Sequence, residues 1–168
     1  MSVMRKPYVD KVVVNIGVGE SGEKLMKAEK VIQMVTKHKP VRTISKTTNR
    51  DFGIRMGQAI GCKVTLRHED AEKFLKDAFW IKQNKMLDYS FDDSGNVSLG
   101  VSDYTDFPGM KYDPGIGIFG MDICVTLKRP GFRISERKRC ARKLPRKQRI
   151  SPEDAMGFMK EKFNIEVV

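Results

Sequence analysis

A glycine-rich segment has the spacing best suited to chemistry in this 168-residue chain. Gly17–Gly22 (GVGESG) matches the pattern of a dinucleotide-binding loop and stands between a predicted strand and a predicted helix. In the true fingerprint, an acidic residue about 20 positions later binds the ribose hydroxyls. Residues 30–50 contain no Asp or Glu, and the glycine pattern recurs at Gly115–Gly120 before a predicted strand. A nucleotide-dependent enzyme built on Gly17–Gly22 is therefore an alternative with weak support.

The other residues that could support catalysis or bind metal are scattered. There is no Gly-Lys-Ser/Thr phosphate loop, and His38 and His68 have no cysteine at ligand spacing. Because Cys62, Cys124 and Cys140 form no Cys-x-x-Cys pair, we interpret them as reduced packing residues. We predict no enzymatic activity, no metal site and no cofactor.

The net charge indicates a polyanionic partner. A formal charge of +11 and a pI near 9.7 suit a nucleic acid or an anionic membrane surface. Nucleic acid is favoured, because no apolar run approaches membrane-spanning length and no signal peptide opens the sequence. We expect a cytoplasmic protein that does not bind membranes.

Most of this charge lies in a basic extension, residues 128–149, which has eleven basic residues and one acid and so contributes +10. Such a run can be a solvated tail. Here a helix follows at 151–163, with Ser151 as N-cap, Pro152 at its first position and Asp154 completing a capping box. Since both ends are tethered, we predict a phosphate-binding arm that uses Lys128, Arg129, Arg133, Arg137, Lys138, Arg139, Arg142, Lys143, Arg146, Lys147 and Arg149.

Residues 41–67 are predicted to form a long β-hairpin around which the rest of the chain is organised. Its second arm alternates, with Ile60, Cys62, Val64 and Leu66 on one side and Gly61, Lys63, Thr65 and Arg67 on the other. The loop between the arms, Lys46–Gly57, is too long for a tight turn. Its basic residues surround one aromatic residue, Phe52, which suits nucleic acid.

The remaining periodicities predict an α+β fold in one domain, residues 1–168. Strands are expected at 8–18, 97–101 and 123–127, helices at 23–37 and 69–81, and a long ordered loop at 106–120. We predict a two-layer sandwich, a mostly antiparallel sheet with helices on one face. The uncovered face would carry Asn15, Lys63, Thr65 and Arg67.

Six stretches of the chain closely resemble the L5 family of large-subunit ribosomal proteins, which bind 5S rRNA. They are NIGVGE (15–20), KPV (39–41), FGIR (52–55), IGCKVTLR (60–67), FPG (107–109) and GMDI (120–123). The start of the chain and the Lys128–Gly131 segment resemble the archaeal and eukaryotic branch.

The resemblance implies a protein of the central protuberance, bound as a monomer within the ribosome. Its expected partners are 5S rRNA, large-subunit rRNA, P-site tRNA and neighbouring ribosomal proteins, with a small-subunit protein across the intersubunit bridge as one candidate. Residues expected at 5S rRNA are Asn15, His38, Lys39, Lys63, Thr65 and Arg67. Those expected at tRNA are Lys46, Thr47, Thr48, Asn49, Arg50, Phe52 and Arg55. A free-standing RNA-binding regulator is the other alternative.

Overall fold

The computed structural model describes residues 3–168, whose contacts group into two compact units. The first unit comprises residues up to Val12, Arg67–Ser98 and Cys124–Val168, and the second comprises Val13–Leu66 and Leu99–Ile123. The chain passes between them within three strands and at the junction after the hairpin.

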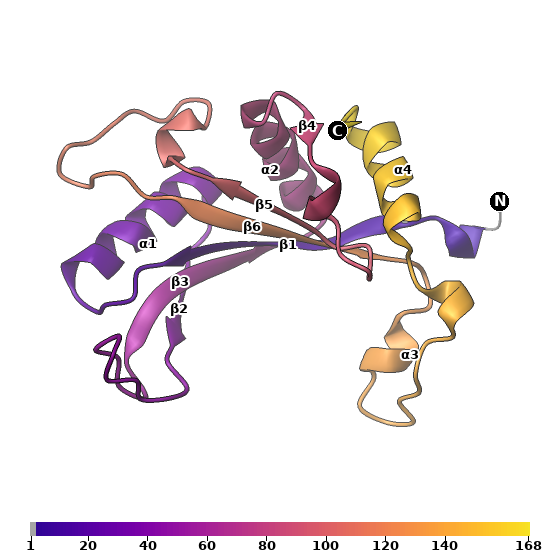
Figure 1. The fold of residues 1–168 in the computed structure, drawn as a ribbon, viewed down its shortest axis with the longest axis horizontal. Coiled ribbons are helices and arrows are strands. Elements are labelled where there is room, and N and C mark those ends of the chain that lie inside the picture. The colour runs from indigo at the N-terminus through magenta and orange to yellow at the C-terminus, as the bar shows by residue number, and fades with distance from the viewer. Residues whose placement is uncertain (1–2) are drawn as a thin grey trace. The chain divides into compact units, whose positions relative to one another are not determined.

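A five-stranded, mostly antiparallel sheet confirms the predicted α+β class. Its strands, in spatial order, are β2 (Val41–Ile44), β3 (Ala59–Leu66), β1 (Tyr8–Gly17), β6 (Met121–Lys128) and β5 (Val97–Val101) (Figure 1). The predicted hairpin is present, because β2 pairs antiparallel with β3 from Val41 opposite Lys63 to Ile44 opposite Ala59. Alternating apolar residues of β1, β3 and β6 are buried, as their period of two requires.

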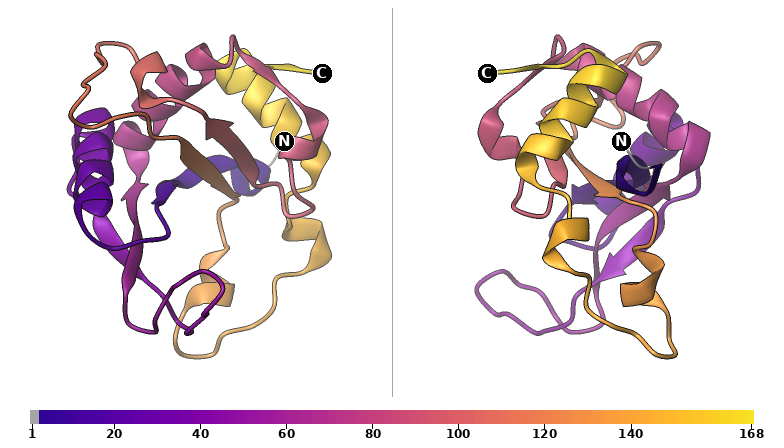
Figure 2. Two further views of the ribbon diagram at one scale, coloured as in Figure 1. Left: turned by 60° about the vertical axis from the view of Figure 1, so that its left-hand side comes forward. Right: turned by 90° about the vertical axis from the view of Figure 1, so that its right-hand side faces the viewer.

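In the second unit, helix α1 (Glu23–Thr36) packs along the sheet beside β3 (Figure 2). Its buried stripe, Leu25, Ala28, Val31 and Ile32, is the one that the sequence predicts. At the last turn Thr36 is buried in place of Val35, and its hydroxyl donates to the Ile32 carbonyl at 2.7 Å. The helix ends at Lys37 in the left-handed conformation, before Pro40.

In the first unit, helices α2 (His68–Ile81) and α4 (Pro152–Phe163) pack together through Phe79 and Phe163, whose ring centroids are 5.3 Å apart. The predicted capping box of α4 is present: Ser151 and Asp154 each accept a hydrogen bond from the other's backbone. Smaller elements that the sequence did not predict are β4 (Lys85–Met86) paired with β7 (Glu166–Val167), α3 (Arg133–Glu136), and the 3₁₀ turns η1 (Val3–Arg5), η2 (Asp88–Ser90), η3 (Tyr104–Asp106) and η4 (Arg146–Gln148).

The prediction that all three cysteines are packing residues was wrong for two of them. Cys62 is buried, but Cys124 and Cys140 are exposed. Cys124 lies on the outward side of β6, between buried Ile123 and Val125, and Cys140 lies in the basic extension. Alternation with Ile123 and Val125 already places Cys124 on the outward side of the strand, so the packing interpretation holds only for Cys62, which lies on the buried side of β3.

Candidate nucleic-acid interface

One face of the hairpin is polar and uncovered in the second unit. Lys63 and Thr65 are exposed on β3, and Asn15 is half-buried on β1, the neighbouring strand. Helix α1 covers the opposite face, where Cys62 and Val64 are buried. The sheet therefore presents the hydrogen-bonding side chains of Asn15 and Thr65 and the ammonium group of Lys63 to solvent, at positions set by the strands. Recognition of a folded RNA requires groups of this kind.

Close strand packing keeps this face flat at Gly61. A Cβ atom there would lie 2.7 Å from the Ile16 carbonyl oxygen and 2.8 Å from the Thr43 hydroxyl. Only glycine fits between β2 and β1 at this point. The polar face predicted from the alternation therefore requires glycine at position 61, where a side chain would collide with the neighbouring strands.

The covered face ties the hairpin to α1 by an ion pair. Arg42 on β2 donates to Glu29 on α1 through Nε at 2.5 Å and Nη2 at 3.1 Å. The hydrogen bond to Glu29 raises the pKa of Arg42. Burial, with the charge of Glu29, raises the pKa of the Cys62 thiol to about 11. Beyond α1, exposed His38 and Lys39 lie on the turn that leads into β2.

The hairpin loop is a folded structure with its own hydrogen bonds, extending past the ends of β2 and β3 (Figure 2). Asn49 and Ile54 exchange backbone hydrogen bonds at 2.9 Å, and the Asn49 side chain accepts from the Asp51 amide at 2.9 Å. The side chain of Phe52 at the tip is 74% exposed, so it does not anchor the loop. Arg50 and Arg55 on either side of it are exposed as well. A loop with this shape can present one aromatic ring between cations.

The glycine-rich segment supports the hairpin instead of forming a nucleotide cradle. The amides of Val18 and Gly19 both donate to the Ile60 carbonyl, at 3.0 and 2.8 Å. Gln58 also donates to the Ser21 hydroxyl at 3.1 Å. A dinucleotide-binding loop needs free amides at this turn and a parallel neighbour for the second strand, whereas β2 pairs antiparallel with β3. The structure contradicts the dinucleotide interpretation of Gly17–Gly22.

In the first unit, the basic extension forms a closed loop between β6 and α4 (Figure 1). The guanidinium of Arg129 donates to the Arg149 carbonyl at 2.9 Å, which joins the two ends of the segment. Gln148 adds a second closure by donating to the Pro130 carbonyl at 2.8 Å. The short helix α3 and the turn η4 lie between these contacts. The segment is an ordered loop and not an extended tail.

Two basic residues of this extension are bound to carboxylates. Arg129 is buried and donates to Asp154 at 2.7 Å. Lys128 lies 2.9 Å from Asp10 and 2.5 Å from Glu136. Although partial burial acts against it, hydrogen bonding to these two carboxylates raises the pKa of Lys128. The other nine cations are exposed: Arg133, Arg137, Lys138, Arg139, Arg142, Lys143, Arg146, Lys147 and Arg149.

The residues predicted to bind 5S rRNA fall in both units. Asn15, His38, Lys39, Lys63 and Thr65 belong to the second unit, and so does the hairpin loop. The first unit contains Arg67, at the start of α2, where its guanidinium lies 3.6 Å from Asp10. Sequence reasoning missed the carboxylates, which approach the cations only in the folded chain.

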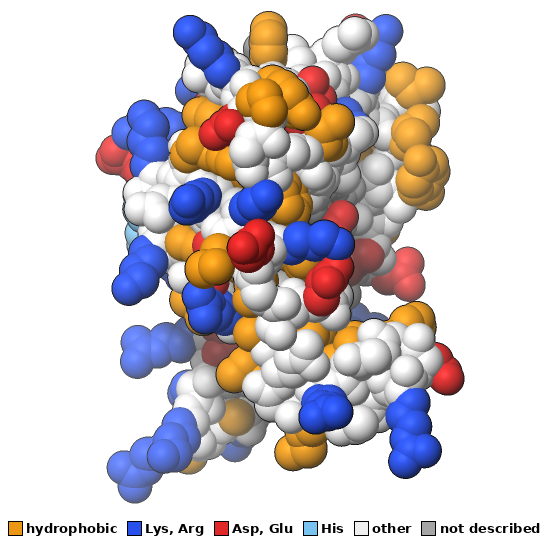
Figure 3. Space-filling view, turned by 90° about the vertical axis from the view of Figure 1, so that its left-hand side faces the viewer, with side chains coloured by type: hydrophobic (Ala, Val, Ile, Leu, Met, Phe, Trp, Pro, Cys, Tyr) orange, Lys and Arg blue, Asp and Glu red, His pale blue; other side chains and the backbone are white. Residues whose placement is uncertain are grey.

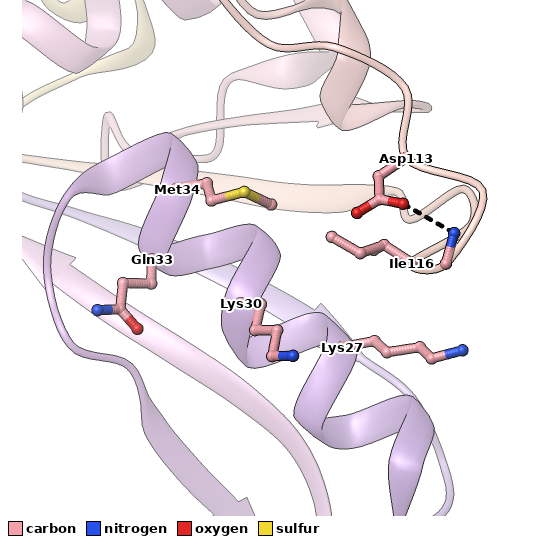
Figure 4. Close-up of a pocket in the computed structure, with 7 residues that line it drawn as sticks. Lys27, Lys30, Gln33, Met34, Asp113 and Ile116 are labelled. Carbon is pink, nitrogen blue, oxygen red and sulfur yellow. Dashed lines mark hydrogen bonds between the residues drawn. The ribbon is translucent and has the colours of Figure 1, made fainter.

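A pocket of about 570 Å³ in the second unit was not predicted. It lies between α1 and the 113–116 turn, and in Figure 4 Met34 and Ile116 point into it. Its lining comprises Lys27, Lys30, Gln33, Met34, Asp113, Gly115 and Ile116. Figure 3 shows a face of the molecule where cations alternate with acidic and apolar side chains. The pocket lining is likewise a mixture of cationic, acidic, polar and apolar side chains, so it favours no single class of ligand.

Metal-binding clusters and membrane-spanning helices are both absent from the part of the chain that the structure describes. Across residues 3–168, no group of three or more His, Cys, Asp or Glu side chains could hold a metal ion. None of the helices in this range is both long enough and apolar enough to cross a membrane.

Family models cover nearly the whole chain. Residues 2–55 match the model described as ribosomal protein L5, and residues 59–158 match the model for the C-terminus of the same ribosomal family. The chain belongs to the ribosomal L5 family. The first match ends at residue 55, inside the hairpin loop, and the second begins at residue 59, the first residue of β3. The two compact units divide the chain differently, because β1, β5 and β6 each have residues in both units.

The family assignment also rests on archaeal relatives of nearly the same length. The chain is 52% identical over 167 residues to the large ribosomal subunit protein uL5 of Methanosphaera stadtmanae, covering 99% of each chain. It is 53% identical over 167 residues to that of Methanoculleus marisnigri, covering 99% of this chain and 100% of the relative. For Thermoplasma volcanium the identity is 52% over 169 residues, with 100% and 99% covered. The L5 family consists of ribosomal proteins and not of enzymes.

Proposed function

We propose that this L5-family protein is a constituent of the large ribosomal subunit in the cytoplasm. It binds 5S rRNA through the uncovered sheet face, large-subunit rRNA through the basic extension, and P-site tRNA through the hairpin loop. It acts as a monomer within the ribosome and contacts neighbouring ribosomal proteins, including one of the small subunit. The names of its relatives, all large ribosomal subunit proteins, support the first part of this proposal.

The observation that carries the proposal is the exposed polar face of a sheet whose other face is covered by α1. Lys63 and Thr65 project from β3, which lies between β2 and β1 in the sheet and pairs with β2 as far as Lys63, so the strand is held in place before binding. Rigid placement of hydrogen-bonding groups favours recognition of one RNA shape over another.

The cations of the basic extension serve a different purpose. Nine exposed Lys and Arg side chains neutralise phosphates and carry no sequence information. Lys128 and Arg129 are bound to carboxylates, so we assign them to the base of the extension and not to direct phosphate contact.

Binding selectivity tests the sheet face. We expect the purified protein to prefer a 5S rRNA transcript over a duplex RNA of similar length. Replacing Thr65 or Asn15 with alanine should cost about 1 kcal/mol per lost hydrogen bond, or about fivefold in affinity. The salt dependence should stay unchanged, since neither residue is charged. Ser94→Ala, which removes an exposed hydroxyl from a turn outside the sheet, is the matched control. Equal losses on both RNAs would refute recognition by this face.

The hairpin loop is tested on assembled ribosomes. Neutralising Arg50 and Arg55 should weaken P-site tRNA occupancy and leave 5S rRNA affinity nearly constant. Phe52→Leu should lose a stacking contact, typically worth about 1–3 kcal/mol. The reverse result, lost 5S rRNA binding with normal P-site occupancy, would show that the loop and the sheet have been assigned the wrong ligands.

A further inference from the structure

Two carboxylates lie against the most basic part of this protein, where simple electrostatics would disfavour them. Glu136 is the one acid among residues 128–149, and Asp154 follows in the first turn of α4. Both belong to the first unit, as do the cations that they contact. For a surface that binds phosphates, each negative charge weakens the attraction unless it has another purpose.

Asp154 helps to close the extension through Arg129. The guanidinium donates to Asp154 Oδ2 at 2.7 Å and to the Arg149 carbonyl at 2.9 Å. Arg129 therefore links the start of the extension to its end and to α4. Partial burial raises the pKa of Asp154, but hydrogen bonds from Ser151 and the charge of Arg129 outweigh it and lower that pKa. The carboxylate thus stays ionised beside its partner.

Glu136 provides the second closing contact. Its Oε1 lies 2.5 Å from Lys128 Nζ, which also lies 2.9 Å from Asp10 on β1. The side chain of Lys128 is 14% exposed and that of Glu136 is 56% exposed, so only the lysine side of this ion pair is shielded from solvent. The contact joins α3, inside the extension, to Lys128 at the end of β6, and Lys128 in turn contacts Asp10 on β1.

We propose that Asp154 and Glu136 are positioning residues for RNA binding, two acids that raise the affinity of the basic extension by closing it into a fixed loop. This inference rests on the proposed function. A closed loop presents its nine exposed cations in one arrangement, and the ordering cost is met during folding instead of during binding. An open segment with the same charge would have to be ordered by the RNA itself.

The proposal predicts a change in RNA affinity opposite in sign to the change expected from charge alone. Asp154→Asn and Glu136→Gln each remove a negative charge, so a purely electrostatic surface would bind RNA equally well or more tightly. We expect each variant to bind a large-subunit rRNA fragment and a duplex RNA roughly two- to tenfold more weakly, as when one or two side chains must be ordered on binding. The slope of log affinity against log salt should stay that of the wild type, because every exposed cation is retained.

Matched variants separate positioning from other causes. Glu153→Gln removes the same charge from the same turn of α4, and Glu153 is exposed with no ion pair within the described residues. It should bind as the wild type or slightly more tightly. Asp154→Glu should restore part of the affinity. Ser151→Ala breaks the helix cap and also removes the hydroxyl that donates to Asp154 Oδ2, so it should lower thermal stability and weaken RNA binding less than Asp154→Asn does.

Limited trypsin digestion provides a readout that needs no RNA. Cleavage inside residues 128–149 should be faster in Asp154→Asn than in Glu153→Gln at a temperature where circular dichroism shows both folded. If Asp154→Asn and Glu136→Gln bind RNA as tightly as Glu153→Gln, the positioning role is refuted while the proposed function stands. If the wild type binds neither RNA, the proposed function itself fails.

Discussion

Three adjacent cations in the basic extension, Arg137, Lys138 and Arg139, offer the most direct test of phosphate binding. All three are exposed, unlike Lys128 and Arg129, whose charges are bound to carboxylates. Replacing the three with glutamine lowers the formal net charge from +11 to +8, since 11 − 3 = 8. All three side chains are exposed, and the hydrogen bond that Arg137 donates to the Cys140 carbonyl at 3.0 Å is an exposed one, so we expect the fold to be retained.

The expected change can be calculated from counterion release. Each phosphate contact with a duplex contributes about −0.9 to the slope of log affinity against log salt, so three lost contacts reduce the slope by about 2.7. Between 50 and 200 mM salt, a fourfold change, the wild type should therefore lose about 40-fold more affinity than the variant does. Fewer contacts would give a proportionally smaller difference.

Fluorescence anisotropy with a labelled large-subunit rRNA fragment, titrated at four or more salt concentrations, measures this slope. The control replaces Lys24, Lys73 and Lys160 with glutamine, which removes the same formal charge from exposed positions on α1, α2 and α4. The reasoning is wrong if both triple variants show the same slope, because the extension would then be a solvated surface with no particular phosphate contacts.

Four further outcomes are expected. Gly61→Ala should destabilise the protein by about 1–3 kcal/mol in urea unfolding, because its Cβ would lie 2.7 Å from a backbone oxygen. Gly157→Ala, in an open helical position, should stabilise it by about 0.5–1 kcal/mol. The pKa of Asp154 is lowered in the folded state, so the ionised carboxylate stabilises the fold. This stabilisation is fully present above the unfolded pKa of about 3.9 and is lost as pH falls through the folded pKa. The melting temperatures of wild type and Asp154→Asn should therefore converge below about pH 4. Iodoacetamide at pH 8 should label the two exposed cysteines first, because Cys62 is buried and the pKa of its thiol is raised to about 11.

Local patterns in the sequence were sufficient to predict the longer strands and helices, but not the short elements β4, β7 and α3. The alternation from Ile60 to Leu66 predicted β3 and its faces, although Arg67, expected on the same face, is the residue that precedes α2. The apolar stripe of residues 25–32 predicted α1. The Ser151 capping box predicted the start of α4 at the correct residue. These signals depend on neighbours one to four positions apart, and such neighbours are fixed by backbone geometry before any tertiary contact forms.

Only the tertiary structure decided what the charged and polar groups contact. Lys128 and Arg129 resemble their basic neighbours in sequence, yet they are bound to Asp10, Glu136 and Asp154. The amides of the glycine-rich segment likewise donate to Ile60, more than 40 positions away. An ion pair or hydrogen bond forms where two groups lie within a few ångströms, and for these groups that distance is set by the packing of strands and helices remote in sequence. Composition therefore indicated a polyanionic partner, while packing determined which cations remain exposed.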